Sequence, residues 1–139
     1  MSRASVPILL KGILHPDDAV LAAEAGIAGV IVSNHGARQL DGTIPPADAL
    51  PGIVDALAGR AEVYVDGGIR SGVDVLRALA LGARAVLIGR PYLWALAIDG
   101  EAGVRELLAR FKNEVRNAMA LSGQLDATSV DRDIVVAAS

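Results

Sequence analysis

The stretch EVYVDGGIRSG, residues 62–72, sets the architecture because it joins an apolar run to a glycine turn. The run EVYV is rich in residue types that favour strands, and its shortness predicts a buried strand. The paired glycines permit a tight turn. A helical pattern follows over residues 73–81 and stops at Gly82. A strand, a turn and a helix form one βα unit, which predicts a parallel α/β fold.

The same unit recurs on both sides of this stretch. Strands are predicted at residues 7–13, 29–34, 62–68 and 85–90. Helices are predicted at residues 17–25, 47–57, 73–81, 91–100 and 101–121, and glycines follow most of them as stops. The tail from Gln124 onwards has no assignable pattern.

The composition predicts one domain over residues 1–139, because 53% of the residues are hydrophobic and the chain is short for two cores. A formal charge of -3 and the absence of basic clusters argue against nucleic-acid binding. With no cysteine there is neither a disulfide framework nor a thiolate metal site. No run reaches the roughly 18 apolar residues of a membrane span, and no signal peptide is evident. We expect a cytoplasmic protein without a membrane span.

Polar residues and glycines cluster directly after each predicted strand. They are Lys11, residues 33–41, residues 66–71, and Gly89 with Arg90. In parallel α/β folds, ligands bind at the carboxyl ends of the strands. We therefore expect one shared site at this end of the sheet.

Two of these clusters, DGGIRSG and IGRP, are typical of a phosphate cradle. Glycines let a phosphate approach backbone N–H groups, a following helix presents its positive end, and Arg70 and Arg90 supply charged donors. Such a site recurs after the last two strands of TIM barrels. The alternative is a pair of tight βα turns whose arginines face solvent.

The stretch SNHGARQLDG, residues 33–42, predicts a base beside a carboxylate clamp. The His35 imidazole can act as a general base near neutral pH, and the Arg38 guanidinium suits a carboxylate. The alternative is a loop histidine bonded to backbone, with Arg38 paired to Asp41. For Lys11 two interpretations stand equal: a partner for an anion, or a terminal lysine that reaches water.

Other candidate residues have ordinary interpretations. His15 precedes a predicted helix, so we expect it on the surface. No HxH or HExxH spacing occurs, so we expect no metal site. Tyr92 and Trp94 follow the IGRP motif at helical spacing, which favours core packing over a cofactor contact.

These motifs together resemble the FMN-dependent α-hydroxy acid oxidases and dehydrogenases, a family that includes glycolate oxidase, lactate oxidase and mandelate dehydrogenase. The resemblance rests on LLKGIL, VIVSNHGARQLDG, YVDGGIRSGVDVLRALALGA, IGRPYLWALA and MALSG, in the family's order and spacing. It implies FMN as cofactor and oxidation of a small α-hydroxy acid, similar to lactate or glycolate, to a 2-oxo acid.

The resemblance also implies roles for individual residues. Lys11 and Ser33 would contact the flavin ring, His35 would be the catalytic base, and Arg38 would bind the substrate carboxylate. The FMN phosphate and ribityl chain would be held by Asp66, Gly67, Gly68, Ile69, Arg70, Gly89 and Arg90. One departure is Ala37, where the family often has glycine; we expect it to be tolerated.

The larger departure is length. The family forms (β/α)8 TIM barrels, which need about 250 residues, and this chain matches the last four βα units. We therefore expect a half-barrel that associates into a homo-oligomer through its open edges, and that alone binds FMN weakly or not at all and is inactive. Alternatives are a non-catalytic half-barrel or phosphate-binding module, or another phosphate-binding barrel such as type 2 isopentenyl diphosphate isomerase or IMP dehydrogenase. The stretch SNHGARQ argues against these two enzymes.

Overall fold

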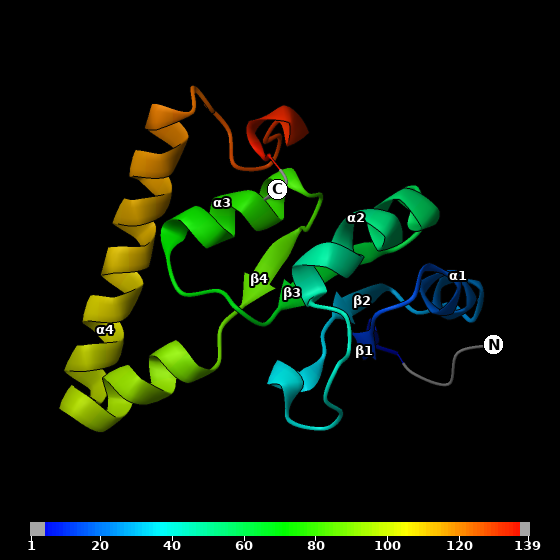
Figure 1. Cartoon of the computed structure of the whole chain (residues 1–139), viewed down its shortest axis with the longest axis horizontal. Helices are drawn as coiled ribbons and strands as arrows, with labels where there is room; N and C mark the ends of the chain where they lie inside the picture. Colours follow the sequence, from blue (N-terminus) through cyan, green and yellow to red (C-terminus); the bar gives the residue numbers. More distant parts are fainter. Residues whose placement is uncertain (1–4, 137–139) are drawn as a thin grey trace.

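The computed structural model describes residues 5–136 and shows four parallel strands in the order β1-β2-β3-β4 (Figure 1). The strands are β1 (Leu9–Ile13), β2 (Gly29–Val32), β3 (Glu62–Asp66) and β4 (Ala85–Leu87). The helices are α1 (Pro16–Glu24), α2 (Pro46–Leu57), α3 (Gly72–Ala80) and α4 (Arg90–Leu121). Every strand and helix predicted above is confirmed. Two 3-10 turns, η1 (His35–Ala37) and η2 (Arg132–Ile134), were not predicted.

One face of the sheet packs against helices. Along β2 and β3, Val30, Val32, Val63 and Val65 point to this face and are buried. The helices supply the opposing apolar layer. Its buried members include Ala19, Ala22, Ala49, Leu50, Ile53, Leu57 and Ala78. This layer is the single hydrophobic core of the described residues.

The other face of the sheet, called here the inner face, is more open. Residues on it alternate with the buried valines, and the strand register places Lys11 beside Ile31, and Ile31 beside Tyr64. Leu9 and Leu87, on the two edge strands, remain 44% and 37% exposed. With helices outside and this face inside, the four βα units have the arrangement of half a (β/α)8 barrel.

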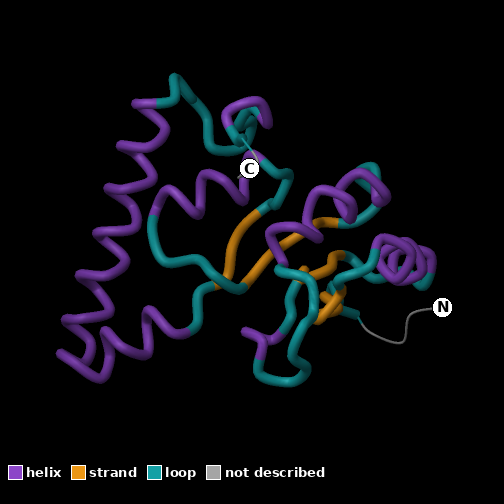
Figure 2. The backbone as a smooth tube through the Cα atoms, in the orientation of Figure 1, coloured by secondary structure: helices purple, strands orange, loops and turns teal. Residues whose placement is uncertain are grey.

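Helix α4 is two helices joined at a corner (Figure 2). Asp99 and Gly100 have non-helical backbone angles, and Gly100 has φ 52°, which glycine adopts without strain. The predicted boundary between the helices at 91–100 and 101–121 is therefore confirmed. The longer arm packs along α3 and buries Leu107 and Phe111.

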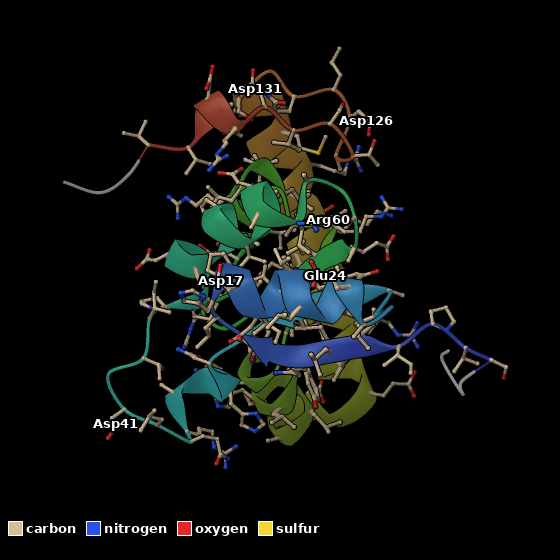
Figure 3. The ribbon with its side chains drawn as sticks, turned by 90° about the vertical axis from the view of Figure 1, so that its right-hand side faces the viewer. Asp17, Glu24, Asp41, Arg60, Asp126 and Asp131 are labelled. Atoms are coloured by element: carbon tan, nitrogen blue, oxygen red, sulfur yellow. The ribbon has the colours of Figure 1, made fainter. Side chains whose placement is uncertain are left out.

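The tail after Gly123 folds back over the helices. Arg132 Nη1 lies 3.0 Å from Asp55 Oδ1 of α2, and the Asp131 amide donates to Gln124 Oε1 at 3.0 Å. Figure 3 shows Asp126 and Asp131 at this end of the molecule and Asp41 at the opposite end, on the loop after η1. Within residues 5–136, none of the helices has the length and apolar character needed to cross a bilayer.

Candidate active site

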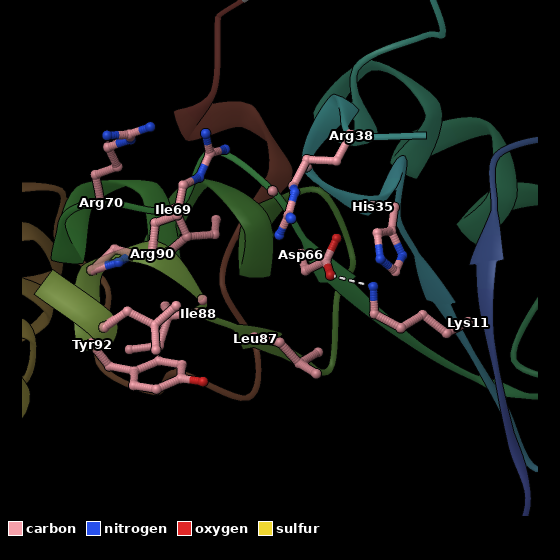
Figure 4. A pocket seen from close by; sticks show the side chains of 16 residues that line it. Lys11, His35, Arg38, Asp66, Ile69, Arg70, Leu87, Ile88, Arg90 and Tyr92 are labelled. Carbon is pink, nitrogen blue, oxygen red and sulfur yellow. Dashed lines mark hydrogen bonds and ion pairs between the residues drawn. The ribbon is translucent and has the colours of Figure 1, made fainter. Parts of the chain in front are cut away.

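A pocket of about 340 Å³ lies at the carboxyl ends of the strands, where the predicted clusters meet. Its polar lining is Lys11, His35, Gly36, Arg38, Asp66, Gly67, Gly68, Arg70, Gly89 and Arg90. Figure 4 shows His35, Arg38, Asp66 and Lys11 on one side of the pocket, with Arg70, Arg90 and Tyr92 on the other. The structure brings the predicted clusters together around one pocket, and this pocket has two chemically different ends.

Lys11, Ser33 and Asp66 form a charged cluster at the first end. Lys11 Nζ donates to Ser33 Oγ at 2.7 Å and to Asp66 Oδ2 at 2.5 Å. Ser33 is 2% exposed, so its hydroxyl is fixed by its surroundings. Lys11 is therefore held by Ser33 and Asp66 of this chain, while its side chain stays 40% exposed.

The second carboxylate oxygen of Asp66 has no partner. Asp66 Oδ1 is buried and accepts no hydrogen bond within residues 5–136. A buried carboxylate oxygen without a donor carries a desolvation cost of about 1–3 kcal/mol or more. A ligand hydroxyl or N–H group that donates to this oxygen would remove that cost.

The loop after β2 places the His35 imidazole at the pocket through a left-handed backbone. His35, Gly36 and Ala37 have φ values of 60°, 69° and 58°. Two hydrogen bonds support this conformation: the His35 amide donates to Ser33 Oγ at 3.1 Å, and the Ala37 amide donates to Asn34 Oδ1 at 3.2 Å. Non-glycine residues held in this region cluster at functional sites.

Ala37 occupies a conformation that favours glycine, which explains the family's preference noted above. A non-glycine residue in this conformation carries backbone strain.

Arg38 lines the pocket and makes no ion pair within the part of the chain that the structure describes. The alternative in which it pairs with Asp41 is therefore wrong. Arg70 and Arg90 are likewise free of acidic partners among these residues. Three unpaired guanidinium groups give the pocket a positive charge that suits an anionic ligand.

The second end of the pocket has the features of an anion cradle, but only one of the two helix ends is available. At α3, Ser71 and Asp74 form a capping box, and Asp74 Oδ2 accepts from the Arg70 and Ser71 amides at 3.1 and 3.0 Å. Glu114 Oε2 accepts from the Gly72 amide at 2.7 Å. These carboxylates occupy the amides of residues 70–72, so the first turn of α3 does not offer them to an anion.

The first turn of α4 is open by comparison. Its N-cap, Gly89, makes no side-chain cap hydrogen bond, and Arg90 begins the helix. A Cβ added at Gly68 or Gly89 would meet nothing within 4 Å, so both backbones face free space. An anion therefore has access to the α4 amides and to Arg90.

Apart from Ile69, which was among the predicted cofactor-binding residues, the apolar wall of the pocket was not predicted. It consists of Ile69, Leu87, Ile88, Pro91, Tyr92 and Leu93. Strand alternation could have indicated Leu87, which lies in register with Asp66. The expected core packing of Tyr92 and Trp94 is wrong, because these side chains are 39% and 49% exposed.

His15 lies on the surface, as expected, and it also has a structural role. Its Nδ1 accepts from the Asp17 amide at 3.2 Å and so caps α1.

Comparison with known proteins identifies the family. The model for FMN-dependent dehydrogenases matches residues 1–137. The chain belongs to this family. The alternative assignments to isopentenyl diphosphate isomerase and IMP dehydrogenase are therefore wrong, and the resemblance inferred from the motifs is confirmed.

Individual relatives agree with this assignment. The chain is 54% identical to 2-hydroxyacid oxidase 1 of Mus musculus over 131 residues, 94% of this chain and 35% of that protein. It is 56% identical to an L-lactate dehydrogenase of Caulobacter vibrioides over 129 residues, 93% of this chain and 34% of that protein. The chain thus spans about a third of the length of the curated relatives it matches.

A solved structure of a mandelate oxidase mutant with a monooxide FMN adduct superposes with a TM-score of 0.90 at 54% identity. It covers 93% of this chain and 41% of the mandelate oxidase chain. The half-barrel architecture predicted from the sequence is confirmed.

Proposed function

We propose that this chain provides the cofactor cradle and the catalytic base for FMN-dependent oxidation of an α-hydroxy acid to a 2-oxo acid. The observation that carries the proposal is the placement of His35 and Arg38 at one end of a pocket whose other end is a positively charged anion cradle. The relatives are named as oxidases or dehydrogenases of 2-hydroxyacids and lactate, which supports the same reaction class.

The residues present fit FMN. The buried Asp66 Oδ1 lacks a donor, and the ribityl chain of FMN carries hydroxyl groups that can supply one. The open backbones at Gly68 and Gly89, with the unpaired Arg90, suit its phosphate. Lys11 and Ser33 would lie near the ring, where the ammonium group favours negative charge.

When bound, FMN would accept a hydride equivalent, that is, the two electrons and the hydrogen that leave the hydroxyl-bearing carbon of the substrate. Arg38 binds the substrate carboxylate through its planar fork and so orients the hydroxyl group. An imidazole nitrogen of His35 accepts the hydroxyl proton as the carbonyl of the 2-oxo acid forms. The hydrogen bond from the His35 amide to Ser33 holds the base in place during this transfer.

Competition between FMN and inorganic phosphate tests the proposal. In ³¹P NMR titrations of the purified chain we expect phosphate to bind at the cradle and FMN to displace it, even where FMN binding is weak. Arg90→Gln should weaken both ligands. Arg38→Lys is the matched control and should leave both unchanged, because Arg38 serves the substrate end. If FMN fails to displace bound phosphate, the cradle does not hold the cofactor.

We also propose that the chain self-associates. The edge strands and Leu9 and Leu87 on the inner face leave backbone donors and apolar surface open, which favours pairing with a second copy. Sedimentation should show a dimer or larger species. A stable monomer at all concentrations would exclude this.

A further inference from the structure

Arg70 is fixed at both of its ends. Its backbone amide donates to Asp74 Oδ2 at 3.1 Å. Its guanidinium carbon lies 5.1 Å from the centroid of the Trp94 ring, within the range of a cation–π contact. The pocket wall includes Arg70, so a fixed guanidinium group bears directly on what the pocket binds.

The contact links two parts of the cradle. Arg70 belongs to the loop after β3, whereas Trp94 lies one helical turn after Arg90 on the first arm of α4. The first arm of α4 therefore carries Arg90 itself and contacts Arg70 through Trp94. Trp94 is half exposed, so burial of the indole in the core does not explain its position.

A free arginine loses side-chain entropy when it binds an anion, which weakens binding. An arginine already stacked on an aromatic ring has lost part of that freedom. The ring leaves the edge of the guanidinium group, with its N–H donors, available for phosphate oxygens.

We propose that Trp94 is a positioning residue that holds Arg70 ready for the phosphate group of an anionic ligand. The identity of that ligand as FMN rests on the proposed function, whereas the positioning of Arg70 requires only a phosphate group.

The test is a double-mutant cycle with inorganic phosphate as the probe. Phosphate affinity is measured for the parent chain, Trp94→Leu, Arg70→Gln and the double variant. We expect Trp94→Leu to weaken binding about two- to fivefold, the factor that an exposed cation–π pair supplies. In the Arg70→Gln background the same change should have no effect. Trp94→Phe keeps an aromatic face and should lose less phosphate affinity than Trp94→Leu. This variant replaces Trp94→Leu in the cycle if Trp94→Leu does not fold.

Fluorescence gives an independent readout, because Trp94 is the only tryptophan of the chain. Phosphate should change its emission in the parent chain and not in Arg70→Gln. The proposal is overturned if the parent binds no phosphate, or if Trp94→Leu weakens binding equally in both backgrounds or not at all. If phosphate binds with the expected coupling but FMN does not displace it, the role of Trp94 stands and the proposed function fails.

Discussion

Replacing Gly72 with alanine probes how closely α4 is fitted onto α3. A Cβ at residue 72 would lie 2.3 Å from the Val115 amide nitrogen and 2.5 Å from the Glu114 carbonyl carbon. Both are backbone atoms, so no side-chain rotation relieves the overlap. The long arm of α4 has to move by about 1 Å to restore ordinary contact.

The cost follows from what that movement breaks. The hydrogen bond from the Gly72 amide to Glu114 Oε2 is 2.7 Å long, and a shift of this size takes it out of range. A hydrogen bond to a charged group contributes about 1.5–3 kcal/mol, and overpacking costs about 1–3 kcal/mol. Because the two costs overlap, we expect the free energy of unfolding to fall by about 2–5 kcal/mol.

Urea denaturation of the purified chain measures this change. Gly52→Ala is the matched control, since Gly52 lies inside α2 and its added Cβ would meet only Pro16 Cγ at 3.5 Å. That variant should gain about 0.5–1 kcal/mol from helix propensity. The reasoning is refuted if Gly72→Ala unfolds at the same urea concentration as the parent, or if both variants shift in the same direction.

Three further predictions concern the loop after β2. In the assembled enzyme, His35→Gln should lower kcat by about 10²-fold or more while FMN stays bound; loss of flavin instead would contradict a role as base. Arg38→Lys should raise KM for the α-hydroxy acid with little loss of flavin, since an ammonium group cannot form the bidentate fork; unchanged steady-state kinetics would place Arg38 outside the substrate site. Ala37→Gly should stabilise the chain by about 1 kcal/mol, because residue 37 has φ 58°, whereas Ala25→Gly, at φ -74°, should destabilise it in the same urea assay.

The sequence predicted the strands and helices well because their ends carry local signals. Glycines with positive φ follow α1 at Gly26 and the helix over 72–80 at Gly82, and the apolar runs between them are short. The corner near Gly100 was equally visible as a glycine between two helical patterns. Signals of this kind depend only on neighbouring residues.

Contacts between residues far apart in the sequence could not be predicted from such local signals. Lys11 and Asp66 are 55 positions apart, and their ion pair depends on two strands that flank a third. The carboxylate of Glu114, 42 residues away in the sequence, accepts from the Gly72 amide at the start of α3, which no local motif indicates. Trp94 was misjudged because helical spacing does not say which side of a helix the protein covers.

The corner at Asp99 and Gly100 lets the two arms of α4 run in different directions, one at the pocket and the other along α3. A straight helix of 32 residues would be about 48 Å long, longer than a domain of this size is wide. If its first turn still pointed at the pocket, its far end would project into solvent. The corner lets the short arm follow the cradle while the long arm follows α3. The two arms meet closely there, because a Cβ added at Gly103 would lie 2.3 Å from the carbonyl oxygen of Ala95. Only glycine permits this approach, so the direction of the long arm on α3 fixes the direction in which the short arm presents its first turn to the pocket.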